Sequence, residues 1–136
     1  MDKKIIITIP HYNNPVGLIN TISSINDPIK IDIVITDDGS EIKLDEHQVR
    51  SKYNNKGNIH FIYLDKNYGV GIAANKCLEY VKNKSYKYVA RLDAGDISYK
   101  NKFSKQIEFL EKNNQIMLVG TWARVCLLYT SPSPRD

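Results

Sequence analysis

The stretch YVARLDAGD, residues 88–96, passes from an apolar run to two carboxylates, and it contains the strongest fold signal in the sequence. Its first half has the β-branched and aromatic character of a buried strand, predicted over residues 88–92. Gly95 supplies a turn between Asp93 and Asp96 where that strand would end. Two close carboxylates need a cation or hydrogen-bond donors to offset their repulsion, so the turn suits a divalent metal. It equally suits a polar turn whose aspartates cap the next helix.

Further apolar runs predict that strands and helices alternate along the chain. Other strands are predicted at residues 4–9, 31–36, 59–64 and, as the start of another strand, 116–119. Asn14 followed by Pro15 predicts the start of a helix, and residues 45–52 predict a short helix with Val49 facing inward. Apolar residues at helical spacing predict three faces: Leu18, Ile19, Ile22 and Ile25; Val70, Ala73, Ala74, Cys77, Leu78 and Val81; Phe103, Ile107 and Leu110.

This alternation predicts a single α/β domain, with a mostly parallel sheet and helices on both faces. In such a sheet the carboxyl ends of the strands meet at one edge, where ligands bind. The loops at residues 10–14, 37–40 and 93–96 leave that edge, and each is rich in acids or amides. Residues far apart in the sequence are therefore expected to converge on a single ligand.

Composition is that of an ordinary soluble domain, with 42% hydrophobic and 25% charged residues in 136. A net charge of +4 favours anionic partners, but the lysines are dispersed and no basic recognition helix predicts nucleic-acid binding. The N-terminal apolar run ends at Pro10, too early for a signal sequence or a membrane span. Cys77 and Cys126 have neither metal-ligand nor disulfide spacing, which predicts a cytoplasmic protein, and Cys77 is expected to be a core residue.

The C-terminal residues differ in kind from the rest. From residue 124 the sequence loses strand and helix periodicity and ends in SPSPRD, a run that suits neither element. This tail resembles translated adapter sequence at a truncated gene end. The domain is therefore predicted to span residues 1–123, and residues 124–136 are predicted to be non-native or disordered.

Four motifs, taken in order, resemble the nucleotide-sugar half of the family 2 glycosyltransferases. They are Pro10-x-Tyr12-Asn13, Asp37-Asp38-Gly39-Ser40, Asn67-x-Gly69 with Asn75, and Leu92-Asp93-Ala94-Gly95-Asp96. Each motif is weak alone, but the combination is specific and covers the chain from residue 3 to about residue 122.

The resemblance implies a GT-A fold, Rossmann-like and incomplete in this chain, with a nucleoside-diphosphate sugar donor and inversion at the anomeric carbon. It also implies Mg²⁺ or Mn²⁺ as a cofactor, with Asp93 and Asp96 as metal-binding residues. Asp38 would accept a hydrogen bond from the base, and Tyr12 would line the base and ribose pocket. The residues implied to bind the nucleotide sugar are Pro10, Tyr12, Asn13, Asp38, Asn67, Gly69, Asn75, Asp93 and Ala94.

Two departures from the family pattern affect the chemistry. Gly95 stands where the family more often has an aspartate that binds the metal, so either Asp93 and Asp96 suffice or metal affinity is weakened. The family's catalytic base and acceptor-binding segment follow the region covered here, so no base is assigned. The chain alone is predicted to transfer little or no sugar. By analogy, the acceptor is a carbohydrate or lipid-linked molecule in bacterial surface polysaccharide or lipopolysaccharide synthesis, with peripheral association at the inner membrane face through missing regions.

Simpler interpretations exist for single residues. Asp38 also suits an Asx turn, and Tyr12 could pack on the rim. His11 is interpreted as a loop residue without a carboxylate partner, and Arg91 as pairing with a carboxylate. Asn75 is expected to lie in a helix and to hydrogen-bond back to a loop.

Two other protein classes share parts of this pattern. A signalling receiver domain also places an Mg²⁺-binding acidic cluster at the carboxyl edge of a parallel sheet, but its acidic pair follows the first strand, whereas Asp37 and Asp38 follow the second. A dinucleotide-binding domain would use Gly69-x-Gly71, but the third glycine is missing and the motif follows the third strand. Both rank below the transferase.

Overall fold

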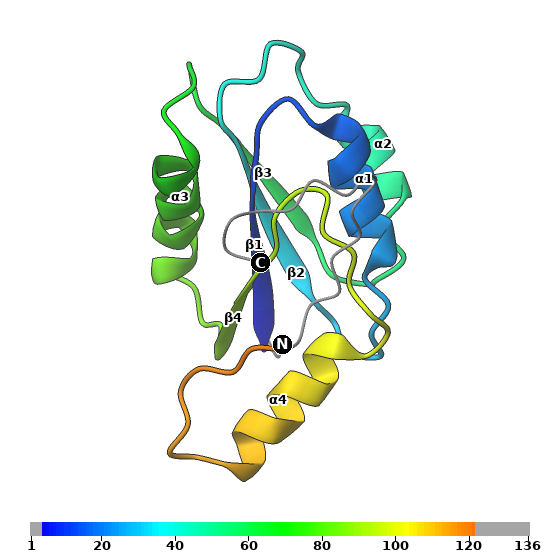
Figure 1. The fold of residues 1–136 in the computed structure, drawn as a ribbon, viewed down its shortest axis with the longest axis vertical. Helices are drawn as coiled ribbons and strands as arrows, with labels where there is room; N and C mark the ends of the chain where they lie inside the picture. The colour runs from blue at the N-terminus through cyan, green and yellow to red at the C-terminus, as the bar shows by residue number, and fades with distance from the viewer. Residues whose placement is uncertain (1–3, 122–136) are drawn as a thin grey trace, which may run out of the picture.

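The computed structural model describes residues 4–121, which form a sheet flanked by helices (Figure 1). The chain runs through β1 (Ile5–His11), α1 (Pro15–Ser24), β2 (Asp32–Asp37), α2 (Glu46–Ser51), β3 (Ile59–Tyr63), α3 (Val70–Lys82), β4 (Tyr88–Arg91) and α4 (Lys102–Lys112). The strand order is β3-β2-β1-β4, and all neighbours are parallel. The predicted α/β class is confirmed. The predicted tail at residues 124–136 lies outside the described residues and stays a prediction.

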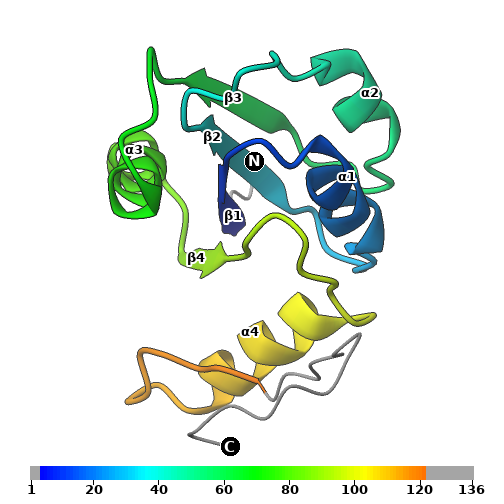
Figure 2. The same cartoon turned by 45° about the horizontal axis from the view of Figure 1, so that its top comes forward.

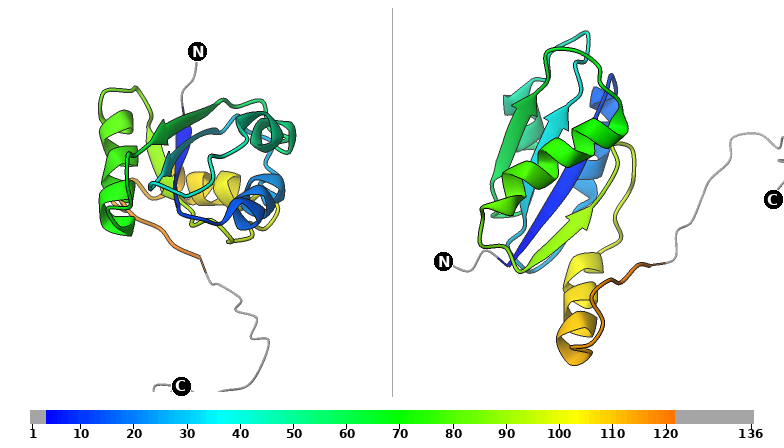
Figure 3. Two further views of the ribbon diagram at one scale, coloured as in Figure 1. Left: turned by 90° about the horizontal axis from the view of Figure 1, so that it is seen from above. Right: turned by 90° about the vertical axis from the view of Figure 1, so that its left-hand side faces the viewer.

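Helices cover both faces of the sheet, with α1 and α2 on one face and α3 on the other (Figure 3). Successive side chains of a strand point to opposite faces. Ile7 and Ile9 therefore belong to the core under α1, while Ile6 packs with Val34 and Cys77 under α3. Both β1 and β2 are buried along their whole length, which is why their middle residues form nearly continuous apolar runs.

The connections explain where a ligand can bind. From β1 the chain moves through α1, β2 and α2 to β3 at one edge, and α3 then returns it across the opposite face to β4, beside β1 (Figure 2). The direction of strand addition thus reverses between β1 and β4. In open α/β sheets a crevice opens at the carboxyl ends of the two strands that flank such a reversal.

The first strand is longer than predicted. A loop was expected from Pro10, but β1 continues through Pro10 and His11, which pair with Thr36 and Asp37 of β2. In a strand, the N–H and C=O of one residue point to the same neighbour, and the carbonyl of Thr8 accepts from Leu92 on the β4 side. The missing N–H of Pro10 therefore faces the side where β4 has already ended, so the proline removes no bond to β2.

The outer strand is less buried than predicted. β4 is the edge of the sheet, and Val89 is 49% exposed because α3 packs over β1 and β2 instead. The strand predicted at residues 116–119 is wrong: this segment pairs with no strand among residues 4–121, and Met117 is 93% exposed. These residues have the apolar character of a strand, but within residues 4–121 no neighbouring strand offers them backbone hydrogen bonds.

The helix predicted after β3 is present, but its apolar face is narrower than expected. Ala73, Cys77 and Val81, each four residues apart, are buried, whereas Val70 and Leu78 are exposed. Two other helix predictions are confirmed: the Asn14 side chain accepts a hydrogen bond from Gly17 N at the start of α1, and Val49 is buried on α2.

Cys77 is the core residue that the sequence predicted. Its side chain is fully buried, Sγ lies 3.1 Å from Thr36 Oγ1, and burial raises the pKa of the thiol above its usual value. Because the thiolate is the reactive form, we expect Cys77 to resist alkylation in the folded chain and to react rapidly in denaturant. Peptide mass spectrometry after iodoacetamide treatment measures this; equal labelling in both states would show that α3 opens readily.

Candidate functional site

A cavity of about 370 Å³ opens at the carboxyl ends of the strands, where the direction of strand addition reverses. Segments that follow all four strands contribute to its wall. The lining residues are Pro10 and His11 at the end of β1, Tyr12 and Asn14 after it, Asp38 after β2, Asn67, Gly69, Val70 and Ala73 after β3, and Asp93 and Ala94 after β4. The predicted convergence of distant loops on one site is therefore what the fold produces.

All the predicted nucleotide-binding residues except Asn13 and Asn75 line this cavity. Asn13 is exposed and bonds to the loop after β2: its N–H donates to Ser40 Oγ and its side-chain oxygen accepts from Glu41 N. Asn75 lies in α3 as expected, but its side chain is exposed and forms no hydrogen bond within residues 4–121. The predicted bond from Asn75 back to a loop is wrong, because this position faces away from the sheet.

Asp38 is almost fully buried, and its carboxylate holds the loop after β3 in place. Oδ1 accepts from Tyr68 N at 2.8 Å, and Oδ2 accepts from Gly69 N at 2.9 Å and from Asn67 Nδ2 at 3.0 Å. Hydrogen bonds to an ionised acceptor are the stronger kind. Asp38 therefore fixes the floor of the cavity. The Asx-turn interpretation of Asp38 is wrong, because the local bond from Ser40 N goes to Asp37; the contact of Asp38 with a base stays a prediction.

Asp37, the preceding residue, holds the loop after β1. Its Oδ1 lies 2.8 Å from His11 Nδ1 and accepts from Ser40 Oγ at 2.6 Å, while Oδ2 accepts from Ser40 N. The interpretation of His11 as a loop residue without a carboxylate partner is wrong: it ends β1, is buried, and pairs with Asp37 across the sheet. Asp37 ends β2 and Asp38 follows it, and their carboxylates bond different segments: Asp37 bonds His11 and Ser40, and Asp38 bonds the loop after β3.

The turn after β4 is built around the two carboxylates that the sequence singled out. Asp96 Oδ2 accepts from Asp93 N at 3.1 Å, and Gly95 has a φ of 106°, which favours glycine. Asp93 lines the cavity and pairs with Arg91 at 3.2 Å, so the predicted pairing of Arg91 with a carboxylate is confirmed. Asp96 does not line the cavity.

Neither aspartate of this turn caps the following helix. The first N–H groups of α4, those of Phe103 and Ser104, donate instead to the carboxylate of Asp27, which lies in the segment after α1. The helix-cap interpretation of Asp93 and Asp96 is therefore wrong. No local signal could have found Asp27, because it caps a helix more than seventy residues further along the chain.

The charges around the cavity bear on metal binding. The carboxylates of Asp38 and Asp93 line it, but no lysine or arginine of residues 4–121 does. No group of three or more His, Cys, Asp or Glu side chains within residues 4–121 could hold a metal by itself. A hard divalent cation nevertheless fits, because such ions are commonly held by one or two carboxylates together with substrate phosphates. Asp93 is the carboxylate that faces the cavity for this purpose.

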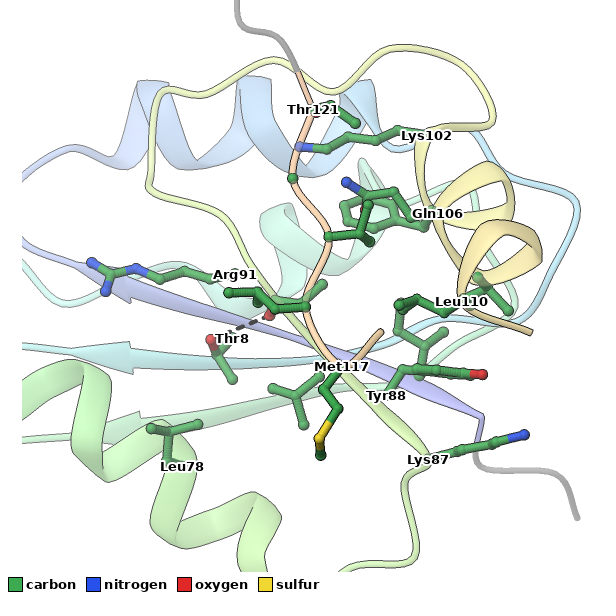
Figure 4. A pocket seen from close by; sticks show the side chains of 18 of the residues that line it. Thr8, Leu78, Lys87, Tyr88, Arg91, Lys102, Gln106, Leu110, Met117 and Thr121 are labelled. Carbon is green, nitrogen blue, oxygen red and sulfur yellow. Dashed lines mark hydrogen bonds between the residues drawn. The ribbon is translucent and has the colours of Figure 1, made fainter. Parts of the chain in front are cut away.

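A larger cavity of about 650 Å³ lies along β4, between α3 and α4 (Figure 4). Leu78, Tyr88, Leu110 and Met117 surround it, and no carboxylate of the described residues lines it. Polar side chains such as Arg91, Lys102 and Gln106 line it as well, but it lies along β4 and not where the loops at the carboxyl ends of all four strands meet. The smaller cavity is therefore the candidate site.

Comparison with known proteins agrees with this site. Residues 6–131 match the family described as Glycosyl transferase family 2. The chain belongs to this family. The receiver-domain and dinucleotide-binding alternatives are thereby excluded.

Several relatives are glycosyltransferases and are much longer than this chain. The uncharacterized glycosyltransferase RC0461 of Rickettsia conorii is 36% identical, over 85% of this chain and 18% of the relative. The bifunctional glycosyltransferase pgtA of Dictyostelium discoideum is 29% identical, over 76% of this chain and 14% of the relative. The putative teichuronic acid biosynthesis glycosyltransferase TuaG of Bacillus subtilis is 34% identical, over 74% of this chain and 39% of the relative. The chain spans less than half the length of each.

Solved structures confirm the GT-A fold. The crystal structure of S. aureus TarS superposes with a TM-score of 0.64 at 22% identity, over 82% of this chain and 20% of that chain. The structure of TarS 1-349 in complex with UDP-GlcNAc gives a TM-score of 0.64 at 25% identity, over 82% of this chain and 32% of that chain. Among residues 4–121, no helix is both long and apolar enough to cross a membrane.

Proposed function

We propose that this family 2 glycosyltransferase chain is the donor-binding part of an enzyme that transfers a sugar, with inversion, from a nucleoside diphosphate to an acceptor hydroxyl. The observation that supports this most directly is the single cavity formed by loops after all four strands, which gathers most of the residues that the motifs implied. The S. aureus structure that resembles this chain at 25% identity holds UDP-GlcNAc, so a uridine nucleotide is the first donor to test.

In this proposal each wall of the cavity contacts a different part of the donor. Tyr12, which is 46% exposed, offers its ring to the base, and the loop held by Asp38 forms the floor under the nucleotide. Asp93 and Ala94 lie near the ribose and diphosphate. The N-terminus of α3 also lines the cavity at Gly69 and Val70; the Gly69 N–H donates to Asp38, but no side chain caps the first turn of the helix, whose N–H groups favour an anion.

We propose Mg²⁺ or Mn²⁺ as the cofactor, held by Asp93 with Asp96 close by in the same turn. A diphosphate brought to a cavity that contains two carboxylates and no Lys or Arg among residues 4–121 needs a cation to offset repulsion. A bound divalent ion supplies that charge and stabilises the negative charge on the leaving diphosphate. Asp93 would exchange its pairing with Arg91 for the metal, while Asp96 fixes the turn through Asp93 N.

The acceptor half of the reaction is assigned to the longer protein. An inverting transfer needs a base on the face opposite the leaving group, and none is assigned among residues 4–121. The chain alone is therefore expected to bind donor but to transfer little or no sugar. The relative named for teichuronic acid biosynthesis supports a setting in bacterial polysaccharide synthesis. By analogy with the family, we propose surface polysaccharide or lipopolysaccharide assembly, with a carbohydrate or lipid-linked acceptor at the cytoplasmic face of the membrane.

Calorimetric titration of the chain with UDP, GDP, dTDP and CDP, each with and without Mn²⁺, tests the proposal. We expect one nucleotide to bind with a Kd on the order of 10 µM, and to bind at least about tenfold more weakly without the metal. Asp93→Asn should remove the metal-dependent part of the affinity, because it replaces the carboxylate that faces the cavity.

Asp65→Asn is the matched control, because Asp65 is an exposed carboxylate outside the cavity, and its removal should leave binding unchanged. Asp96→Ala tests whether Asp96 binds the metal or only fixes the turn through Asp93 N. If it only fixes the turn, this variant should weaken nucleotide binding less than Asp93→Asn does. A folded chain, verified by circular dichroism, that bound none of the four nucleotides would contradict a preformed donor site.

A further inference from the structure

The buried imidazole of His11 connects the segment after β1, which contains Tyr12, with the end of β2. His11 is 3% exposed and ends β1, and its register partner Asp37 ends β2 on the same face of the sheet. On that face the isoleucines at alternate positions of β1 precede it, so the row of apolar side chains ends in a polar pair. His11, unlike the isoleucines that precede it, lines the cavity, and Asp37 lies behind it as its hydrogen-bond partner.

The two ring nitrogens of His11 have different partners, and these define its protonation. Asn14 N donates to Nε2 at 3.0 Å, so Nε2 must offer a lone pair. The ring proton is therefore on Nδ1, which donates to Asp37 Oδ1 at 2.8 Å. His11 is thus a neutral imidazole that donates on one side and accepts on the other.

The acceptor side matters for the site because Asn14 itself lines the cavity and caps α1. The adjacent residue Asn13 has a left-handed backbone, with a φ of 48°, and its N–H donates to Ser40 Oγ, which also donates to Asp37. One connected set of hydrogen bonds, from Asp37 through His11 and Ser40, therefore sets the position of the segment that contains Tyr12. A second proton, on Nε2, would make this nitrogen a donor. It would then face the N–H donor of Asn14, and the hydrogen bond between them would be lost.

We propose that His11 is a positioning residue of the nucleotide site: in its neutral form it holds residues 12–14 in the binding conformation, and its protonation releases them and weakens nucleotide binding. This inference rests on the proposed donor site. It assigns a role to a residue that the four sequence motifs do not include.

The charges around His11 favour this interpretation. Asp37 of β2 is the charged side chain bonded to the ring, and α1, which packs on the same face, has no charged residue. Asp38 after β2 and Asp93 after β4 line the same cavity, and Asp93 is paired with Arg91. Within the described residues, the contact that protonation breaks is therefore the one to Asn14, while the contact to Asp37 persists.

Two amide substitutions separate the two contacts. In His11→Asn the side-chain amide can replace Nδ1 and donate to Asp37, but nothing accepts from Asn14 N. In His11→Gln the amide oxygen can reach the position of Nε2 and accept from Asn14 N. We expect His11→Asn to bind the nucleotide about tenfold more weakly at about pH 8, and His11→Gln to keep most of the wild-type affinity.

The pH profile distinguishes positioning from mere packing. From about pH 8 to about pH 5, wild-type affinity should fall about tenfold further than that of either variant, because protonation of the diphosphate affects all three chains but neither variant has an imidazole at position 11. His47→Asn, an exposed position on α2, is the control and should keep the wild-type profile. If His11→Asn showed the same acid loss as the wild type, the proposal would be overturned.

A ligand-free measurement keeps this inference separate from the proposed function. Two-bond ¹H–¹⁵N couplings of the histidine rings at about pH 8 should show His11 protonated on Nδ1, and the Asn14 amide signal should shift on acidification. A ring protonated on Nε2 would overturn the inference even if nucleotides bind. Absence of nucleotide binding by the wild type, with the expected tautomer present, would contradict the donor site instead.

Discussion

Asp38→Ala is expected to lower the free energy of unfolding by about 3 kcal/mol and to reduce nucleotide affinity at least about tenfold. The buried carboxylate accepts from the backbone N–H groups of Tyr68 and Gly69 and from the amide of Asn67. Alanine removes the carboxylate that these N–H groups donate to, at a position that is almost fully buried. The loop that forms the floor of the cavity would then lose its fixed position.

Urea denaturation followed by circular dichroism measures the change in stability, and calorimetry with the nucleotide that binds best measures the change in affinity. Asp65→Ala is the matched control: this exposed carboxylate lies in the same loop and accepts from Tyr68 Oη, and its loss should cost less than about 0.5 kcal/mol. Equal destabilisation by the two variants would show that the Asp38 bonds do not hold the loop.

Gly39→Ala is expected to destabilise the chain by about 3 kcal/mol or more and to disrupt the same floor from the opposite side. Gly39 has a φ of 69°, in the left-handed region, and an added Cβ would lie 2.2 Å from the backbone carbon of Lys66. Backbone cannot move aside as a flexible side chain can. The loops after β2 and β3 would therefore have to separate.

Gly71→Ala is the matched control for this substitution. Gly71 lies in the first turn of α3, and nothing lies within 4 Å of an added Cβ, so alanine should be neutral or stabilise by up to about 1 kcal/mol. Thermal and urea unfolding of the two variants give the comparison. Comparable stability of both would mean that the close approach of the two loops is not essential.

The two adjacent aspartates at the end of β2 hold different loops. Asp37, the last residue of β2, holds the loop after β1 through His11 and Ser40, whereas Asp38, the next residue, bonds directly to the loop after β3. The central strand thus organises both sides of the cavity. A change at either position is expected to affect binding through the loops, even without direct contact with the ligand.

Much of the candidate site was predictable from sequence because its residues lie directly after strands. Apolar runs located the strand ends, and parallel strands place those ends at one edge, so Asp38 and Asp93 were expected together and are found together; Asn67 was implied by the family resemblance and joins them. Asn75 was not, because a motif gives a position along the chain and not the direction of a side chain on a helix.

Hydrogen-bond partners could not be predicted in the same way. No residue near His11 in the sequence predicts its hydrogen bond to Asp37, and no residue near Phe103 predicts its hydrogen bond to Asp27. Each bond forms only after distant segments have come together. The strand expected at residues 116–119 failed for the same reason, since a strand requires a partner and local periodicity supplies none.

By itself, the sequence determined the α/β class, the alternation of strands and helices that makes the sheet parallel, and the set of loops that meet at the carboxyl edge. These follow from local periodicity, because burial of alternate or helically spaced apolar residues is decided within a few residues of chain. The tertiary structure alone decided that β1 continues through His11, that β4 is an exposed edge, and which donors Asp37 and Asp38 satisfy. Those features depend on contacts between residues far apart in the chain, and only the folded arrangement brings them within hydrogen-bonding distance.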